Sequence, residues 1–354
     1  MHRPGFAFGG RAVETIFTEK HKLRHSQTEL SGGELVYPFE RPSRAEYIID
    51  RVREVGLGPI SDPDEFGMDP ILAIHDSDFV DFLQTVWPRW KEAGFAGEAI
   101  ATNWPAKRMS TRRPEFIEGQ LGYYALAVET SISEGTWEAA YAAAQVALTG
   151  AERIRTSAGV AFSLCRPPGH HATADMFGGY CFLNNAAIAA QYLRDQGATR
   201  VAILDVDFHH GNGTQDIFYA RDDVLFISLH GDPMQAFPYY LGHAEETGEG
   251  AGEGYTLNFP MPEGTPFAVW RDALGQAFKK IEAFKPDALI ISLGVDTFET
   301  DPISFFKLQT PDFLTMGADI AKAGLPTLFV MEGGYDIAEI GVNTVNVLQG
   351  FEGA

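Results

Sequence analysis

Cysteine is scarce in this chain of 354 residues, where it occurs only as Cys165 and Cys181. The two do not form a CxxC pattern, so neither a disulfide framework nor a cysteine zinc site is predicted. The sequence also lacks any run of about 18 apolar residues that could span a bilayer, and its first residues lack the apolar stretch of a signal peptide. These absences predict a cytoplasmic protein without a membrane partner.

Basic side chains are also few. The 27 Lys and Arg residues are outnumbered by 48 Asp and Glu residues, which gives a net charge of −21. A nucleic-acid partner is therefore not expected, because its phosphates would be repelled, whereas a cationic substrate would be attracted. The same charge would also serve solubility alone, so composition leaves the substrate open. With 45% hydrophobic residues, the chain has enough apolar side chains for a large core.

The sequence predicts an α/β fold. No Pro-, Gly- or Ser-rich linker divides it, so we expect one domain over residues 13–354 after a loose leader at residues 1–12. Short apolar, β-branched runs alternate with helical patterns such as 182–198 and 269–284, which is typical of a parallel sheet covered by helices. The predicted strands lie at 14–19, 160–165, 201–207, 224–230, 255–261, 288–296 and 327–334, with two or three more elsewhere.

Residues 79–118 have a different character. They hold three tryptophans and the basic group Lys107, Arg108, Arg112 and Arg113 in an otherwise acidic chain. We interpret this segment as a surface insertion. Because exposed Trp and Arg are enriched at protein interfaces, it is a candidate subunit contact. Equally, the tryptophans could anchor the segment onto its own domain.

Polar side chains follow several of the predicted strands at the point where each strand ends. Ligands of open parallel sheets bind outside these carboxyl ends, where the loops converge. One such residue is usually structural, but several strand ends together predict a site. The residues are His170, His171, Asp205, Asp207, His209, His210, Ser228, His230, Asp296 and Tyr335.

Three of these residues form a candidate metal site. Asp207 and His209 are two residues apart after one strand, and Asp296 follows another strand. Two carboxylates and one imidazole leave a coordination position for water, as a catalytic zinc site requires. Zinc in such a site lowers the pKa of the water and polarises a carbonyl group. Oxygen-rich ligation of this kind also suits Fe²⁺.

The tandem histidines His170 and His171 are then available as acid and base. A neutral imidazole can take a proton from the water and deliver it to a leaving nitrogen, which predicts amide hydrolysis. Tyr335, on a glycine-flanked turn, is placed to donate a hydrogen bond to the oxyanion, although a core tyrosine is the alternative. Tyr180 and Phe237 are candidate walls for a slender aliphatic substrate, or ordinary core residues.

Taken together, the motifs resemble the arginase–deacetylase superfamily, and within it the bacterial acetylpolyamine amidohydrolases. The resemblance runs from about residue 14 to the C-terminus. It implies a single α/β domain on an eight-stranded parallel sheet flanked by helices, with one Zn²⁺ per subunit, structural K⁺ and no organic cofactor. The motifs are RPPGHH, GGYCFLNNAAIAA, ILDVDFHHGNGTQDIFY, SLHGDP, SLGVDTFETDPISFF and MEGGY.

The resemblance also assigns roles to residues. It implies zinc binding by Asp207, His209 and Asp296, a general base and acid in His171, and an electrostatic partner, His170, held by Asp205. Tyr335 would be the oxyanion donor, and Tyr180 and Phe237 would flank the methylene chain of the substrate. It further implies one monovalent cation near Asp205, Asp207, His209, Ser228 and the Leu229 carbonyl, and a second near Phe218 and Val224.

One position departs from the class I histone deacetylases. Asn212 stands where they carry an Asp that holds the second histidine, and the bacterial amidohydrolases resemble this chain there. An amide can orient His171 but cannot stabilise its imidazolium form as a carboxylate would. We therefore expect a lower pKa for His171.

The expected substrates rest on the insertion. In the resembled enzymes it forms a homodimer contact that narrows the mouth of the site and excludes folded proteins. Glu118 matches an acidic residue near the distal amine of the substrate, and Glu129 is a second acidic candidate; either could instead be a solvated helix residue. The expected reaction is zinc-dependent hydrolysis of acetylputrescine, acetylcadaverine, acetylspermidine or acetylspermine to acetate and the free amine.

Other activities remain open. A more open mouth would give a lysine deacetylase acting on acetyl-lysine peptides or proteins, or an enzyme for another small amide. A binuclear manganese ureohydrolase is disfavoured because Phe208 interrupts the ligand pattern it needs. A binding protein that had lost catalysis is disfavoured because no expected ligand or catalytic residue is missing.

Overall fold

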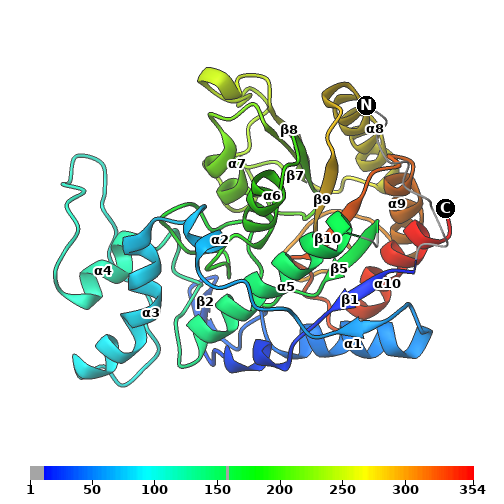
Figure 1. Ribbon diagram of the computed structural model, residues 1–354. Helices are drawn as coiled ribbons and strands as arrows, with labels where there is room; N and C mark the ends of the chain where they lie inside the picture. The colour runs from blue at the N-terminus through cyan, green and yellow to red at the C-terminus, as the bar shows by residue number, and fades with distance from the viewer. Residues whose placement is uncertain (1–11, 157–158) are drawn as a thin grey trace.

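The computed structural model describes residues 12–156 and 159–354. They form a central parallel β-sheet with helices around it (Figure 1). Eight strands pair in the order β4-β1-β5-β10-β9-β6-β7-β8, which confirms the predicted α/β fold. Of the predicted leader, only residue 12 lies within the described residues. The strands are β1 (Glu14–Ile16), β4 (Ile60–Ser61), β5 (Val160–Ser163), β6 (Val201–Asp205), β7 (Val224–Gly231), β8 (Thr256–Met261), β9 (Ala288–Leu293) and β10 (Thr327–Met331).

The central strands are buried on both faces. In β6, Val201 and Ile203 pack into one hydrophobic cluster, whereas Ala202 and Leu204 pack into another on the opposite face. Because successive side chains of a strand point to opposite faces, a strand covered on both sides must be apolar throughout. This explains why the strands appear in the sequence as continuous apolar runs rather than alternating ones.

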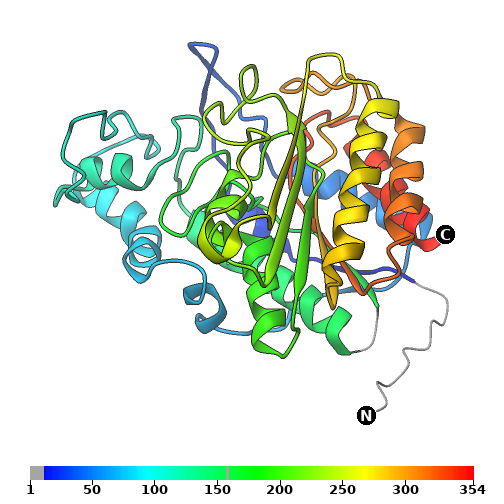
Figure 2. The ribbon, with the colours of Figure 1, turned by 90° about the horizontal axis from the view of Figure 1, so that it is seen from above.

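Helices cover the two faces of the sheet (Figure 2). The predicted helices 182–198 and 269–284 are confirmed as α6 and α8. None of the described helices is long and apolar enough to cross a membrane. One layer contains α5 (Thr136–Thr156), α6 (Asn185–Asp195) and α7 (Asn212–Phe218), and the other contains α1 (Ser43–Val55), α8 (Phe267–Phe284), α9 (Thr310–Ala321) and α10 (Ile340–Glu352).

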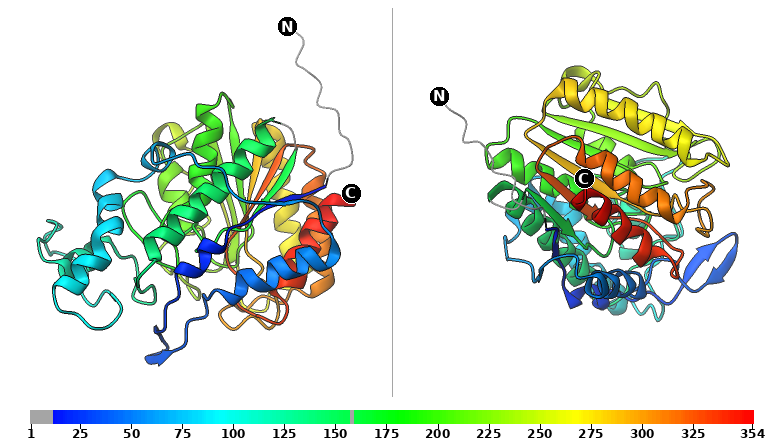
Figure 3. Two further views of the ribbon diagram at one scale, coloured as in Figure 1. Left: turned by 60° about the horizontal axis from the view of Figure 1, so that its bottom comes forward. Right: turned by 90° about the vertical axis from the view of Figure 1, so that its right-hand side faces the viewer.

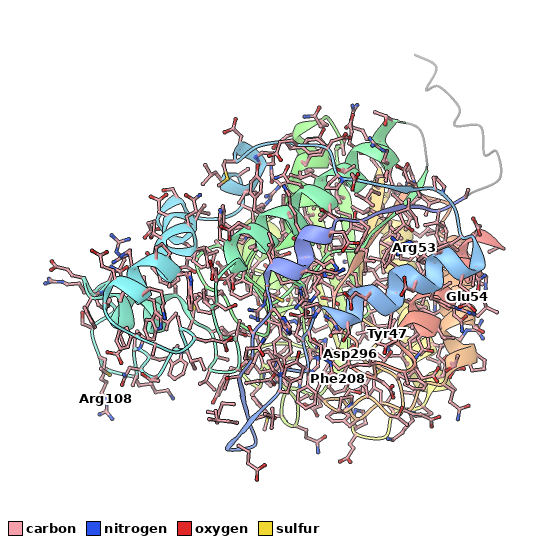
Figure 4. The ribbon with its side chains drawn as sticks, turned by 90° about the horizontal axis from the view of Figure 1, so that it is seen from below. Tyr47, Arg53, Glu54, Arg108, Phe208 and Asp296 are labelled. Atoms are coloured by element: carbon pink, nitrogen blue, oxygen red, sulfur yellow. The ribbon has the colours of Figure 1, made fainter. Side chains whose placement is uncertain are left out.

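The segment 79–118 is only partly a surface feature. Its first part belongs to α3 (Ser77–Glu92), which follows the short helix α2 (Asp69–Leu72) in the chain. The apolar face of α3, including Phe82 and Trp90, packs into the core. The indole of Trp104 donates to the Ala125 carbonyl oxygen at 2.9 Å. These contacts anchor the segment onto its own domain. The loop up to α4 (Ile117–Tyr124) protrudes from the body, with Arg108 far from the sheet (Figures 3 and 4).

A second projection is the hairpin of β2 (Glu29–Ser31) and β3 (Glu34–Val36), which extends from the body in Figure 3. It is antiparallel and separate from the main sheet. Its first residue, Glu29, is buried although the rest of the hairpin is mostly open to solvent.

A buried charge cluster ties the N-terminal elements to the sheet. The carboxylate of Glu40, which is 1% exposed, pairs with Arg166 at 2.8 Å, Arg44 at 3.1 Å and Arg24 at 3.6 Å. Burial alone would raise the pKa of Glu40, but the three guanidinium groups outweigh burial and lower it. Arg24 follows the short helix η1 (Glu19–Leu23), Arg44 lies on α1 and Arg166 follows β5, so one carboxylate joins three elements.

Replacing Glu40 should therefore destabilise the fold strongly. The Glu40→Gln variant leaves three buried guanidinium groups without a counter-charge, and breaking a buried pair in this way costs about 3–5 kcal/mol. We expect a loss of this size in the free energy of unfolding, measured by urea denaturation. The control is Glu54→Gln, which breaks the exposed Arg51–Glu54 pair and should cost less than about 1 kcal/mol. Equal small losses in both variants would contradict the role of Glu40.

Candidate active site

The loops that follow the parallel strands bring the predicted site residues together at one edge of the sheet. Asp207 and His209 follow β6, Asp296 follows β9 and Tyr335 follows β10, and all four are buried. Figure 4 shows Asp296 beside Phe208, and the Phe208 N–H donates to Asp296 Oδ1 at 2.8 Å. The strand order therefore turns positions far apart in the sequence into one cluster.

Asp207, His209 and Asp296 form a compact donor set. Their ligand atoms lie within 4.8 Å of one another. The Nδ1 atom of His209 lies 2.9 Å from Asp296 Oδ2 and 3.3 Å from Asp207 Oδ1. Burial and then the neighbouring Asp207 carboxylate raise the pKa of Asp296, and a bound cation would favour its ionised form. The three residues thus fit one divalent metal ion.

A second buried group consists of His170, Cys181 and Glu332, whose ligand atoms also lie within 4.8 Å of one another. It fits a metal less well. Burial raises the pKa of the Cys181 thiol well above its usual value, and metal ligation needs the thiolate. Glu332 Oε2 already accepts from the backbone N–H groups of Gly169, at 2.7 Å, and His170, at 3.2 Å. Glu332 therefore fixes the backbone of the tandem histidines.

His170 is paired with a carboxylate. Its Nδ1 lies 2.9 Å from Asp205 Oδ2, and its Nε2 lies 3.9 Å from Asp207 Oδ1. Burial lowers the pKa of His170, but Asp207 and then Asp205 outweigh burial and raise it to about 10. A cation bound at Asp207 would oppose this rise. The geometry makes His170 the more cationic of the two histidines.

His171 has a different partner. Its Nδ1 lies 2.6 Å from Asn212 Oδ1, while Asn212 Nδ2 donates to the His171 carbonyl oxygen at 3.4 Å. An amide oxygen can only accept, so the proton of neutral His171 belongs on Nδ1 and the lone pair on Nε2. Burial, and then the charge of His170, lower the pKa of His171 well below its usual value. This leaves a neutral imidazole able to accept a proton.

Arg44 packs against the ring of Tyr335 and binds the backbone before it. Nothing in the sequence indicated this role for Arg44. The guanidinium carbon lies 4.7 Å from the centre of the Tyr335 ring. Arg44 Nε donates to the Gly334 carbonyl oxygen and Arg44 Nη2 to the Glu332 carbonyl oxygen, both at 2.6 Å. Burial raises the pKa of Tyr335 well above its usual value although Arg44 acts to lower it, so the hydroxyl stays a donor.

A cavity of about 450 Å³ opens onto these residues. Tyr180 and Phe237 both line it: the Tyr180 ring centre lies 5.6 Å from that of Tyr335, and the Phe237 ring centre lies 5.0 Å from that of His171. His209 also contributes to its lining. The cavity is therefore a crevice with aromatic walls and a polar floor.

Two carboxylates, Glu29 and Glu129, also line the cavity, and none of the described residues that line it is Lys or Arg. Glu29 Oε1 accepts from the Tyr180 hydroxyl at 2.8 Å. Glu129 Oε1 accepts from the Gly179 N–H, also at 2.8 Å. The two carboxylates thus hold the Tyr180 side chain and the backbone before it in place, and they give the crevice negative charge.

The structure separates the two acidic residues considered from the sequence. Glu129 lines the cavity, whereas Glu118 lies half-buried on α4 and is not among the lining residues of this chain. Glu29 was missed by the sequence reasoning. It lies in the stretch TELSGGEL, where no local pattern marks it as part of a site.

The residues expected near monovalent cations lie around the ends of β6 and β7. Asp205 and Ser228 are register partners in the β6–β7 pair, and Leu229 follows Ser228. Phe218 closes α7, Val224 opens β7, and both are buried. Ser228 Oγ lies 2.8 Å from His230 Nδ1. Cation binding at these positions stays a prediction.

Comparison with known proteins places the chain in a family. A family model for the histone deacetylase domain matches residues 38–351. Acetylpolyamine amidohydrolase of Mycoplana ramosa is 60% identical over 341 residues, covering 96% of this chain and 100% of that protein. Acetylpolyamine amidohydrolase 1 of Pseudomonas aeruginosa is 54% identical, covering 96% and 99%.

A solved structure agrees with these matches. The crystal structure of an acetylpolyamine aminohydrolase from Burkholderia pseudomallei superposes with a TM-score of 0.91 at 41% sequence identity, covering 96% of this chain and 98% of the other. The chain therefore belongs to the histone deacetylase family, in the group of bacterial acetylpolyamine amidohydrolases.

Proposed function

We propose that this enzyme hydrolyses the acetyl amide of acetylated polyamines in a zinc-dependent reaction, giving acetate and the free amine. The substrates would be acetylputrescine, acetylcadaverine, acetylspermidine and acetylspermine. The observation that carries the proposal is the crevice: its floor holds the histidine and tyrosine groups, and its lining includes two carboxylates and, within the described residues, no Lys or Arg.

The chemistry follows from the residues at the floor. Asp207, His209 and Asp296 would hold Zn²⁺, which would polarise the acetyl carbonyl and acidify a water molecule. His171 accepts the proton of the attacking water at Nε2, because Asn212 holds the other ring nitrogen. His171 then delivers this proton to the leaving nitrogen. Tyr335 donates its hydroxyl hydrogen to the developing oxyanion, and His170, paired with Asp205, supplies fixed positive charge.

The charge of the crevice favours amines over neutral amides. A polyamine acetylated at one end keeps at least one ammonium group, and the Glu29 and Glu129 carboxylates would attract it. Tyr180 and Phe237 would flank the methylene chain between the two ends. A lysine deacetylase acting on peptides or proteins is the alternative, since acetyl-lysine has the same acylated aliphatic amine.

Two further features belong to this proposal. We propose structural K⁺ at the ends of β6 and β7, where buried Asp205 and Ser228 face each other in register. We also propose a homodimer through the protruding part of residues 79–118, which would narrow the mouth. Glu118, on α4 beside this loop, would then add negative charge near the distal amine.

The direct test is acetate release by the zinc-loaded protein from acetylputrescine and acetylspermidine, beside an acetyl-lysine peptide and an acetylated intact protein. We expect turnover of the small amines, none of the intact protein, and loss of turnover after chelation that Zn²⁺ restores. Comparable turnover of the intact protein would favour the lysine deacetylase instead.

The Asn212→Asp variant tests the acid–base role of His171. A carboxylate in place of the amide favours the imidazolium form and so raises the pKa of His171. His171 must be neutral to accept a proton, so activity appears only above this pKa. The acidic limb of the kcat/KM profile should therefore move to higher pH. An unchanged profile would show that the limb belongs to another group.

Removing the charge of Glu129 should weaken binding of cationic substrates selectively. The Glu129→Gln variant keeps an oxygen for the Gly179 N–H. We expect KM for acetylspermidine to rise about tenfold, which is 1.4 kcal/mol, and KM for N-butylacetamide, a neutral amide, to change less than about twofold. The Glu118→Ala variant should also raise KM for acetylspermidine more than KM for N-butylacetamide, but only if the protein forms the proposed dimer. Equal changes for both substrates would remove these residues from substrate recognition.

A further inference from the structure

The loop between β9 and α9 contains a buried carboxylate that the proposed chemistry does not use. Asp301 is 6% exposed. Its Oδ2 accepts from the Tyr335 N–H at 2.7 Å and from the Asp336 N–H at 3.3 Å, and its Oδ1 accepts from the Ile303 N–H at 3.1 Å. All three partners are backbone amides, so the carboxylate acts as a clamp between two segments of chain.

The two segments have different places in the site. Tyr335 belongs to the turn after β10, whereas Ile303, Ser304 and Phe305 line the crevice. The turn has little rigidity of its own, because Gly333 and Gly334 precede Tyr335 and Gly334 has a φ of 131°. Its backbone must therefore be held from outside.

Asp301 and Arg44 hold this turn from two sides. Arg44 binds the carbonyl oxygens of Glu332 and Gly334, before the tyrosine. Asp301 binds the N–H groups of Tyr335 and Asp336, at and after it. Arg44 also touches the Tyr335 ring, whereas Asp301 acts on its backbone alone.

We propose that Asp301 is a positioning residue for Tyr335, which sets where the tyrosine hydroxyl meets the developing oxyanion. The inference rests on the proposed role of Tyr335 as oxyanion donor. A shift of about 1 Å in such a group can cost about a hundredfold in rate. Because the same carboxylate holds Ile303, it also keeps the crevice wall in register with the tyrosine.

The experiment is a double-mutant cycle with Asp301→Asn and Tyr335→Phe in the zinc-loaded enzyme, with acetylcadaverine as substrate. The amide keeps the shape of the carboxylate but has one acceptor oxygen, and its NH₂ group opposes a backbone N–H. We expect Asp301→Asn to lower kcat about ten- to a hundredfold, with KM changed less than about threefold. In the Tyr335→Phe background the same substitution should lower kcat less than about twofold, because the hydroxyl it positions is gone.

Asp287→Asn is the matched control. The Asp287 carboxylate also accepts from two backbone N–H groups, those of Thr199 and Arg200 at 2.6 and 3.2 Å, but it precedes β9 at the end of the strand opposite to the site, so kcat should stay within about twofold. Thermal melting checks that each variant is folded. If Asp301→Asn does not fold, Asp301→Glu keeps the charge with one more methylene and should show the same dependence on Tyr335.

Two results would overturn the inference: an equal fall in kcat in both backgrounds, or no fall with intact Tyr335. The cycle separates this failure from a failure of the proposed chemistry. If Tyr335→Phe alone retains the wild-type kcat, the tyrosine is not the oxyanion donor, and the role of Asp301 falls with it. If Tyr335→Phe lowers kcat and Asp301→Asn does not, only the positioning role is wrong.

Discussion

The active-site edge depends on holding two carboxylates, Asp207 and Asp296, side by side at 0% exposure. Burying an ionised carboxylate is costly unless hydrogen bonds and opposite charge replace its lost hydration. Backbone amides supply part of this. Asp207 accepts from the N–H groups of Gly333 and His209, and Asp296 accepts from that of Phe208. His209 Nδ1 also lies 3.3 Å from Asp207 Oδ1 and 2.9 Å from Asp296 Oδ2, and a bound cation would add further opposite charge.

This constraint explains why glycines stand where they do. A Cβ atom on Gly333 would lie 2.4 Å from Asp296 Oδ2 and 2.5 Å from Asp207 Oδ2, and one on Gly294 would lie 2.1 Å from Asp207 Oδ2. Any side chain at these positions would push the carboxylates apart or displace the loops. Gly333 is therefore needed first for close approach to Asp207 and Asp296, whereas Gly334 is needed for its φ of 131° and for its close packing against Val295. The looseness they bring is a consequence, which the contacts from Arg44 and Asp301 offset.

The sequence predicted those parts of the site whose signal is local. The apolar run of β6 ends in Asp205, and Asp207 and His209 follow within four residues, so spacing alone indicated a ligand pair. Arg44 and Glu29 had no such signal. Arg44 meets Gly334 across 290 positions, and Glu29 meets Tyr180 across 151. Such contacts follow from how elements pack, and no local pattern in the sequence distinguishes Arg44 or Glu29 from an ordinary surface charge.

The distribution of charge gives the crevice a direction. Glu29 and Glu129 make part of its wall negative, while Arg44 lies beneath the Tyr335 ring and His170 beside His171 at the floor. A molecule with an ammonium group at one end and an acetyl group at the other would be favoured in one orientation, with the ammonium group toward these wall carboxylates and the acetyl group toward Asp207, His209 and Asp296. In the proposed reaction, a cation held by these residues and the Tyr335 hydroxyl would stabilise the negative charge that develops on the carbonyl oxygen. The field that selects a cationic amine would thus also present its amide to the groups that act on it.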